Sequence, residues 1–184
     1  NGLEIESFNL INKKKKNITI FNENLFKFSS KAENFNKYDF IILSHTLEHF
    51  ENPLSVVDSI KKLLKKNGFC YIVVPNFKSK ISIFTKKYWA WLQPSVHFFH
   101  YNPVGLISMI EKEGFILKYN SNQGGDSLFL LLTLFNFFND YLKITKKIYR
   151  KSYLKKIVIK LSSIIFKYMY YIGNDESLFL FQKK

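Results

Sequence analysis

The chain has 184 residues and a mass of 21.9 kDa, a size that suits one domain with one buried core. Hydrophobic residues make up 47% and charged residues 23%, so a wholly disordered chain is excluded. The formal net charge is +14, yet Arg150 is the only arginine. Because arginine is the usual bidentate reader of guanine and phosphate, this composition argues against a specific nucleic-acid partner. With Cys70 as the single cysteine, an internal disulfide and a cysteine-based zinc framework are also excluded.

The pattern of residues 37–117 alternates between strands and helices. A continuous apolar run over 38–43 predicts a strand covered on both faces. Asn52 and Pro53 then predict the cap and first turn of a helix, which we expect Gly68 to end in the left-handed conformation. Short joins between alternating elements predict parallel pairing through right-handed crossovers. The other expected elements are helices over 102–114 and 128–138 and strands over 3–5, 18–21, 69–74, 115–117 and 177–181.

The last third of the chain contains a basic amphipathic segment. Residues 141–170 carry nine cations and no acid, with apolar residues at roughly helical spacing. This segment can be a solvated cover on the domain, a homodimer surface, an anionic membrane surface contact or, least in keeping with the lysine-rich composition, a nucleic-acid contact. No signal-peptide pattern follows Asn1, which predicts a cytoplasmic protein, with a peripheral position at the inner membrane face as the lipid-binding variant.

Five short motifs, taken in order, resemble a known family. The run YDFIILSHTLEHFENP at 38–53 is similar to the segment after the fourth strand of class I S-adenosylmethionine-dependent methyltransferases. The similarity is strongest to the ubiquinone-pathway O-methyltransferase subgroup. It continues in LLKKNG at 63–68, IVVPN at 72–76, HFFHYNP at 97–103 and EKEGF at 111–115. The resemblance implies an α/β, Rossmann-like methyltransferase sheet with S-adenosylmethionine as cofactor.

The resemblance also implies which residues bind the cofactor. Glu4 matches the acidic position at the end of the second strand, where a carboxylate accepts hydrogen bonds from both ribose hydroxyls. Asn24 and Leu25 match the turn that frames the adenine. Ser44 and His45 match the end of the fourth strand, which contacts the methionine part. Ligands of open α/β sheets lie outside the carboxyl ends of the strands, which agrees with this placement.

The aromatic loop before residue 103 holds the two candidate catalytic residues, His97 and His100. In the family this loop lies over the cofactor, and a histidine there can remove a proton from an acceptor hydroxyl. The alternative is that the rings of this loop form a satellite core while the histidines bind backbone carbonyls.

One part of the family pattern is absent. The glycine-rich turn after the first strand normally lies some twenty residues upstream of the position that Glu4 matches, and the sequence starts at Asn1. We therefore expect an incomplete sheet: an N-terminally truncated methyltransferase core over 1–125, a basic amphipathic helical insertion over 126–171, and the final strand of the core over 172–184.

The expected function is methyl transfer from S-adenosylmethionine, at oxygen, to a small, sugar or lipid-linked acceptor. The alternative is a non-catalytic peripheral membrane or scaffold protein that keeps the fold. A third hypothesis arises because His45, Glu48 and His49 match the H-x-x-E-H pattern of a zinc peptidase family. That pattern needs both histidines on one helix, whereas His45 directly follows a predicted strand, so we expect no metal ligands.

Overall fold

The computed structural model describes residues 21–124, 127–137 and 174–184. Glu4, the predicted strand over 3–5, residues 18–20 of the next predicted strand and the basic segment 141–170 lie outside this range. The described helices are α1 (Leu25–Ser30), α2 (Pro53–Leu63), α3 (Lys80–Thr85), α4 (Pro103–Lys112) and α5 (Ser127–Asn136), with short 3-10 turns η2 (Ala32–Asn34), η3 (Leu47–His49), η4 (Lys86–Tyr88) and η5 (Ala90–Leu92). The strands are β1 (Tyr38–Ser44), β2 (Leu64–Pro75), β3 (Phe115–Gln123) and β4 (Glu176–Lys183).

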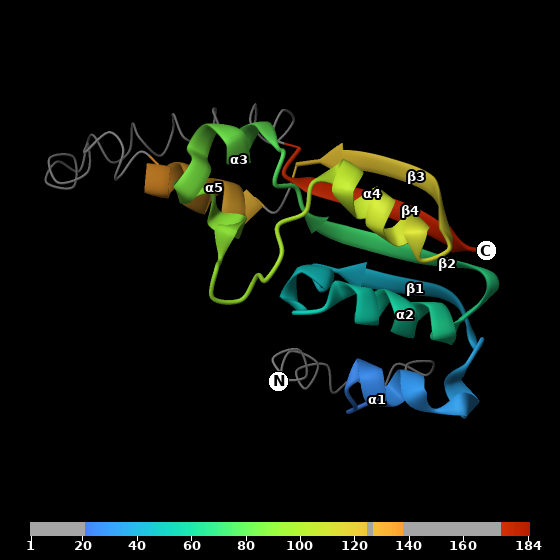
Figure 1. Ribbon diagram of the computed structural model, residues 1–184. Helices are drawn as coiled ribbons and strands as arrows, with labels where there is room; N and C mark the ends of the chain where they lie inside the picture. The colour runs from blue at the N-terminus through green and yellow to red at the C-terminus, as the bar shows by residue number, and fades with distance from the viewer. Residues whose placement is uncertain (1–20, 125–126, 138–173) are drawn as a thin grey trace, which may run out of the picture.

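The four strands form one mixed sheet in the order β1-β2-β4-β3. β1 and β2 are parallel, as predicted, and β4 runs antiparallel to both of its neighbours. The arrows of β1, β2 and β3 therefore point the same way in Figure 1, with β4 inserted between β2 and β3 against them. The predicted α/β class is confirmed, and the last strand returns to the middle of the sheet rather than extending its edge.

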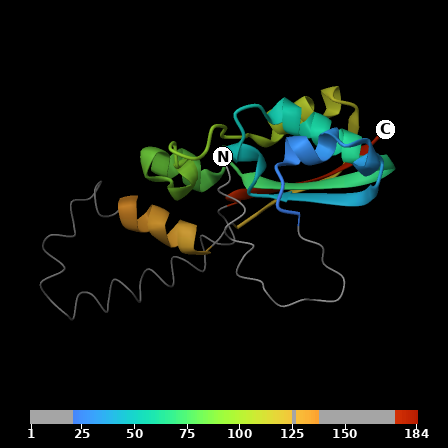
Figure 2. The ribbon, with the colours of Figure 1, turned by 90° about the horizontal axis from the view of Figure 1, so that it is seen from below.

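Helices α1, α2 and α4 all lie on one face of the sheet (Figures 1 and 2). The main core forms between this face and the helices, with Leu47, Val56, Ile72, Leu106 and Phe181 among its buried side chains. Burial of each such side chain contributes roughly 1.5–3 kcal/mol. Among the described residues, no helix is both long and apolar enough to cross a membrane.

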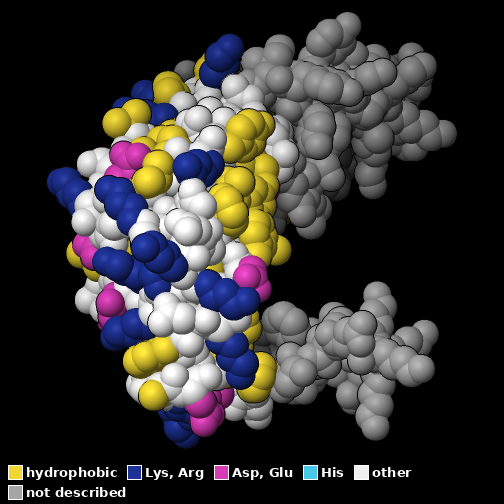
Figure 3. All heavy atoms as spheres, turned by 90° about the vertical axis from the view of Figure 1, so that its right-hand side faces the viewer, with side chains coloured by type: hydrophobic (Ala, Val, Ile, Leu, Met, Phe, Trp, Pro, Cys, Tyr) yellow, Lys and Arg dark blue, Asp and Glu magenta, His cyan; other side chains and the backbone are white. Residues whose placement is uncertain are grey.

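The opposite face of β1 differs from the sequence prediction. Phe40 is 49% exposed and Ile42 is 60% exposed, whereas the strand was predicted to be covered on both faces. A continuous apolar run indicates a buried strand but does not say what covers each side. Figure 3 shows hydrophobic side chains gathered on the side of the sheet away from α2 and α4.

Two asparagine caps set the starts of α2 and α4 as predicted. Asn52 Oδ1 accepts a hydrogen bond from Ser55 N at 3.2 Å, and Asn102 Oδ1 accepts one from Gly105 N at 2.9 Å. Each cap satisfies one of the backbone donors that a helix start leaves unpaired. At the end of α4, Gly114 has a φ of 90°, a conformation that glycine adopts without strain.

The prediction that Gly68 ends α2 in the left-handed conformation is wrong. The helix ends at Leu63, and Asn67 is the residue with a positive φ, at 63°. Gly68 is needed for space instead, because a Cβ there would lie 3.0 Å from Lys65 O and 3.2 Å from Asp39 O. Asparagine tolerates the left-handed region, which leaves glycine free for the close approach.

The end of α2 is stabilised by a lysine from the last strand. Lys183 Nζ donates hydrogen bonds to Lys61 O and Leu64 O, both at 2.6 Å, and to Asn36 Oδ1 at 3.0 Å. Lys183→Met is expected to lower the free energy of unfolding by about 2 kcal/mol, because carbonyl oxygens at a helix end lose their donor. Urea denaturation measures this loss, with the exposed Lys184→Met as control; equal midpoints for the two variants would contradict it.

The single thiol lies in the core, where β2 pairs with β4. Cys70 is buried, and burial raises the pKa of its thiol to about 12. Since the thiolate is the reactive form, we expect Cys70 to resist alkylation by iodoacetamide at neutral pH in the native chain and to react completely in urea. Mass spectrometry of the two samples measures the difference, and rapid labelling of the native chain would show that β2 opens.

Candidate functional site

The predicted site residues near the sheet lie at the carboxyl ends of β1 and β2. This is the end of the sheet at which α3 and α5 are found in Figure 1. Ser44 ends β1 with an exposed side chain, opposite Val73 of β2. Open α/β sheets bind ligands at this edge, and the cofactor contact of Ser44 stays a prediction.

His45, the next residue, is held in a strained position between two carboxylates. Its φ is 48°, and its backbone N–H donates to Val73 O at 3.0 Å. Its Nε2 lies 3.1 Å from Glu176 Oε1, its Nδ1 lies 3.6 Å from Glu48 Oε1, and its ring stacks on Trp91 at 4.7 Å. Burial alone would lower the pKa of His45, but the interactions with Glu176 and Glu48 outweigh it and raise the pKa to about 9. His45 is therefore an imidazolium at neutral pH.

Glu48 and two histidines form a compact cluster next to His45. Glu48 is only 1% exposed, and one ligand atom from each of Glu48, His49 and His97 lies within 4.8 Å of the others. The backbone oxygen of Glu48 accepts hydrogen bonds from Phe98 N at 2.9 Å and Phe99 N at 3.3 Å. These bonds fix the turn after β1 to the aromatic loop.

The rings of the aromatic loop form a separate small core, and its histidines bind backbone carbonyls, as the alternative to a catalytic role supposed. Trp89 and Trp91 are buried in a second cluster, and the histidines contact carbonyl oxygens: His97 Nδ1 lies 2.7 Å from Trp91 O, and His100 Nε2 lies 3.2 Å from Leu92 O. Burial lowers the pKa of His97, which favours its neutral form. His100 is half-buried. The remaining members of the second cluster are Ile81, Leu92 and Leu134.

Two acidic residues of this region were missed from sequence. Glu176 pairs with His45, and Asp175, which is 2% exposed, accepts hydrogen bonds from Ser79 Oγ at 2.7 Å and Trp89 Nε1 at 3.2 Å. Burial raises the pKa of Asp175 despite these bonds. Two adjacent acids directly before the predicted strand over 177–181 are the signal that could have marked them, because β4 starts at the same edge at which β1 and β2 end.

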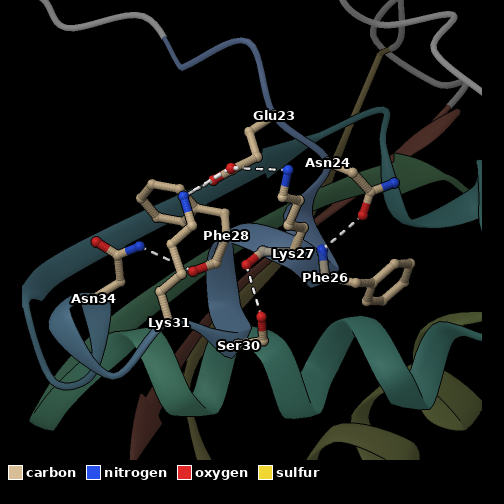
Figure 4. Close-up of polar contacts among 8 residues, drawn as sticks. All are labelled: Glu23, Asn24, Phe26, Lys27, Phe28, Ser30, Lys31 and Asn34. Carbon is tan, nitrogen blue, oxygen red and sulfur yellow. Dashed lines mark hydrogen bonds and ion pairs between the residues drawn. The ribbon is translucent and has the colours of Figure 1, made fainter.

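The two predicted adenine contacts lie on α1. Asn24 is the N-cap of this helix, and its Oδ1 accepts a hydrogen bond from Phe26 N at 2.8 Å (Figure 4). Leu25 packs against the main core. The Phe26 ring lies 5.8 Å from the Phe50 ring, so the start of α1 is near the turn that follows β1. Asn24 and Leu25 thus have clear structural roles, which leave open their predicted contact with the cofactor.

The H-x-x-E-H pattern does not form the arrangement of the zinc peptidases. His45 precedes the turn η3, whereas Glu48 and His49 lie within it, and no α-helix carries both histidines. The Nε2 of His45 is also paired with Glu176.

A family model described as a methyltransferase domain matches residues 4–118. The chain belongs to the methyltransferase-domain family. The predicted methyltransferase class is thereby confirmed, and S-adenosylmethionine is the cofactor that the sequence predicts for it. The family match carries no information on the ubiquinone-pathway subgroup or on the acceptor. No curated protein sequence matches this methyltransferase domain.

Solved structures share the fold of this methyltransferase domain. A SAM-dependent methyltransferase from Archaeoglobus fulgidus aligns with a TM-score of 0.54 at 13% identity, over 92% of this chain and 70% of that one. A candidate sarcosine dimethylglycine methyltransferase from Galdieria sulphuraria gives 0.54 at 15%, over 97% and 64%. The cyclase SpnF gives 0.50 at 12%, over 88% and 54%. The chain therefore spans between 54% and 70% of the length of these neighbours, and at such identities the likeness shows the fold alone.

Proposed function

We propose that the protein transfers a methyl group from S-adenosylmethionine to an oxygen of a small, sugar or lipid-linked acceptor, with His100 as the proton acceptor. The observation that carries the proposal is the position of His100 in the loop beside the carboxyl ends of β1 and β2, in a chain whose family is the methyltransferase domain. When bound, the cofactor supplies a sulfonium methyl that is already reactive. The protein then has to align the acceptor and take up its hydroxyl proton.

The hydrogen bond of His100 fixes which nitrogen can take up that proton. A carbonyl oxygen only accepts, so the contact with Leu92 O places the proton of neutral His100 on Nε2 and leaves the lone pair on Nδ1. Because the His100 side chain is only half-buried, a methyl-acceptor molecule can reach its ring. His97 is also a histidine with one nitrogen bound to a carbonyl, but it is 6% exposed, so the proposal assigns proton transfer to His100.

The cofactor contacts proposed for the end of β1 rest on the position of two residues there. The exposed Ser44 leaves room at the carboxyl end of the strand. His45 follows it directly, and because its ring nitrogens face Glu48 and Glu176, its backbone is the part proposed to lie beside the methionine part. In this proposal Glu4 holds the ribose, and Asn24 and Leu25 lie beside the adenine.

Calorimetric titration with S-adenosylhomocysteine tests the cofactor part of the proposal. We expect binding to the protein, and a loss of at least tenfold in affinity in Glu4→Gln, because an amide offers one acceptor where a carboxylate offers two. The matched control is Glu33→Gln, an exposed acid of η2. Binding that neither variant changes would remove Glu4 from the site, and no binding at all would support the non-catalytic peripheral or scaffold alternative.

We further propose that the basic segment 141–170 brings this methyltransferase to an anionic membrane surface. The support is its sequence alone, nine cations with apolar residues at helical spacing, each cation near the surface contributing on the order of 1 kcal/mol. Sedimentation with liposomes should retain more protein as the anionic lipid fraction rises and less as salt rises. If retention changes with neither the anionic lipid fraction nor the salt concentration, the segment is better interpreted as a domain cover or a homodimer surface.

A further inference from the structure

We propose that Glu48, His49 and His97 form a binding site for a divalent transition-metal ion, of which Zn²⁺ is the representative. One ligand atom from each of the three residues lies within 4.8 Å of the others. The site is different from the H-x-x-E-H pattern, because its second histidine comes from the aromatic loop and His45 is not a member. It also goes beyond the methyl-transfer proposal, which requires no metal.

Hydrogen bonds to backbone carbonyls orient both histidines for ligation. His49 Nδ1 lies 3.0 Å from Val96 O, and His97 Nδ1 lies 2.7 Å from Trp91 O. Because a carbonyl oxygen accepts only, each Nδ1 carries the proton and each Nε2 keeps its lone pair in the neutral ring. Metal-bound histidines almost always donate their other N–H to a carbonyl or carboxylate in this way.

Glu48 provides a second and independent observation. Its side chain is almost completely buried, and neither Oε1 nor Oε2 accepts a hydrogen bond from the described part of the chain. Within the described residues its ion pair is with His45 Nδ1 at 3.6 Å, beyond hydrogen-bond length, whereas the same His45 ring has a shorter contact of 3.1 Å with Glu176. His45 supplies a positive charge near this buried carboxylate but no hydrogen bond, so both oxygens of Glu48 keep lone pairs that a metal ion can use.

The ligand set selects the kind of ion. Two imidazole nitrogens and one carboxylate suit Zn²⁺ and its late first-row neighbours, whereas Mg²⁺ takes oxygen ligands in octahedral geometry. Zinc–nitrogen distances of about 2.0–2.1 Å place tetrahedral ligands roughly 3.3 Å apart, so the 4.8 Å span requires a modest inward rotation of the side chains. Three protein ligands leave a fourth position for water or an oxygen of a small molecule.

The backbone holds the two halves of the site together before any ion binds. Phe98 N and Phe99 N both donate to Glu48 O, and the rings of His49 and His97 meet edge to face with centroids 4.7 Å apart. The ligands therefore come from segments that are already joined, which reduces the ordering that ion binding requires.

Equilibrium dialysis of the untagged protein against Zn²⁺ alone tests the site. We expect one equivalent of zinc in the wild type and at least tenfold weaker binding in Glu48→Gln and in His97→Asn. The matched control is His100→Asn, which changes a histidine of the same loop outside the cluster. Circular dichroism in EDTA checks that each variant folds, and the visible absorption of Co²⁺ in the wild type reports the ligand geometry without any enzyme assay.

The outcomes separate clearly. Zinc uptake that both variants lose and the control keeps supports the site. No uptake by the wild type, equal uptake by the wild type and both variants, or displacement of the zinc by equimolar Mg²⁺ overturns it. Because the measurement uses no cofactor or acceptor, its failure leaves the methyl-transfer proposal unaffected, and failure of S-adenosylhomocysteine binding leaves the zinc result unaffected.

Discussion

His100→Ala is expected to lower kcat for methyl transfer by about 10²–10⁴-fold, the range found when a general base is removed. In our proposal the imidazole has its Nε2 proton fixed by Leu92 O, so that Nδ1 accepts the proton of the acceptor hydroxyl. In the proposal His100 contacts the acceptor and not the cofactor, so the affinity for S-adenosylhomocysteine should stay within twofold. Rates of S-adenosylhomocysteine release with phenol, sugar and lipid-linked hydroxyl acceptors measure the change.

Ser95→Ala provides the control, since Ser95 is an exposed side chain of the same loop. It should leave both kcat and cofactor affinity unchanged. If His100→Ala lowers cofactor affinity as much as kcat, the histidine has a structural role through the Leu92 carbonyl. If it changes neither, a different group takes the proton or the acceptor atom is one that has no proton to lose.

The elements that sequence predicted well are those with local signals at their ends. Asn52-Pro53 and Asn102-Pro103 each combine a capping side chain with a residue whose fixed φ suits the first helical turn, and both helices start there. Gly68 shows the limit of such signals. Glycine serves both left-handed turns and close approaches, and only the position of Asp39 O on the neighbouring strand decides between them.

The arrangement of β4 depended on distant parts of the chain. An apolar run at 177–181 predicted a strand, but its antiparallel place between β2 and β3 requires partners that lie about one hundred and about sixty residues earlier, respectively, in the chain. No local pattern contains that information, because register and direction follow from which faces are buried together.

The sequence predicted single site residues from the family resemblance, but it did not predict which of them contact one another. His97 and His100 were selected, and the structure brings His97 to Glu48 and His49. The partner of His45, Glu176, lies at the start of β4, so its role follows from the same non-local strand order. Glu48 shows the same limitation, because a glutamate in a predicted turn is normally exposed and only the packing of the aromatic loop buries it.

Asp175→Ala is expected to lower the free energy of unfolding by about 3 kcal/mol, the largest stability effect that we predict for a polar residue. The substitution leaves the Ser79 hydroxyl and the Trp89 indole N–H buried without their acceptor, and each such group costs roughly 1–3 kcal/mol. It also removes the side-chain link between the cap of α3 and the residue before β4. Urea denaturation followed by tryptophan fluorescence measures the loss.

Asp175→Asn distinguishes the hydrogen bonds from simple packing. The amide keeps one oxygen that both donors can reach, and it places no charge in the buried position. We therefore expect a smaller loss of about 1 kcal/mol in the free energy of unfolding. Asp58→Ala is the control for a surface acid: its ion pair with Lys62, at 2.7 Å, is largely exposed and should contribute less than about 0.5 kcal/mol. Equal losses in Asp175→Ala and Asp58→Ala would mean that water replaces the missing acceptor, and therefore that the packing of Trp89 against α3 is looser in solution than its burial indicates.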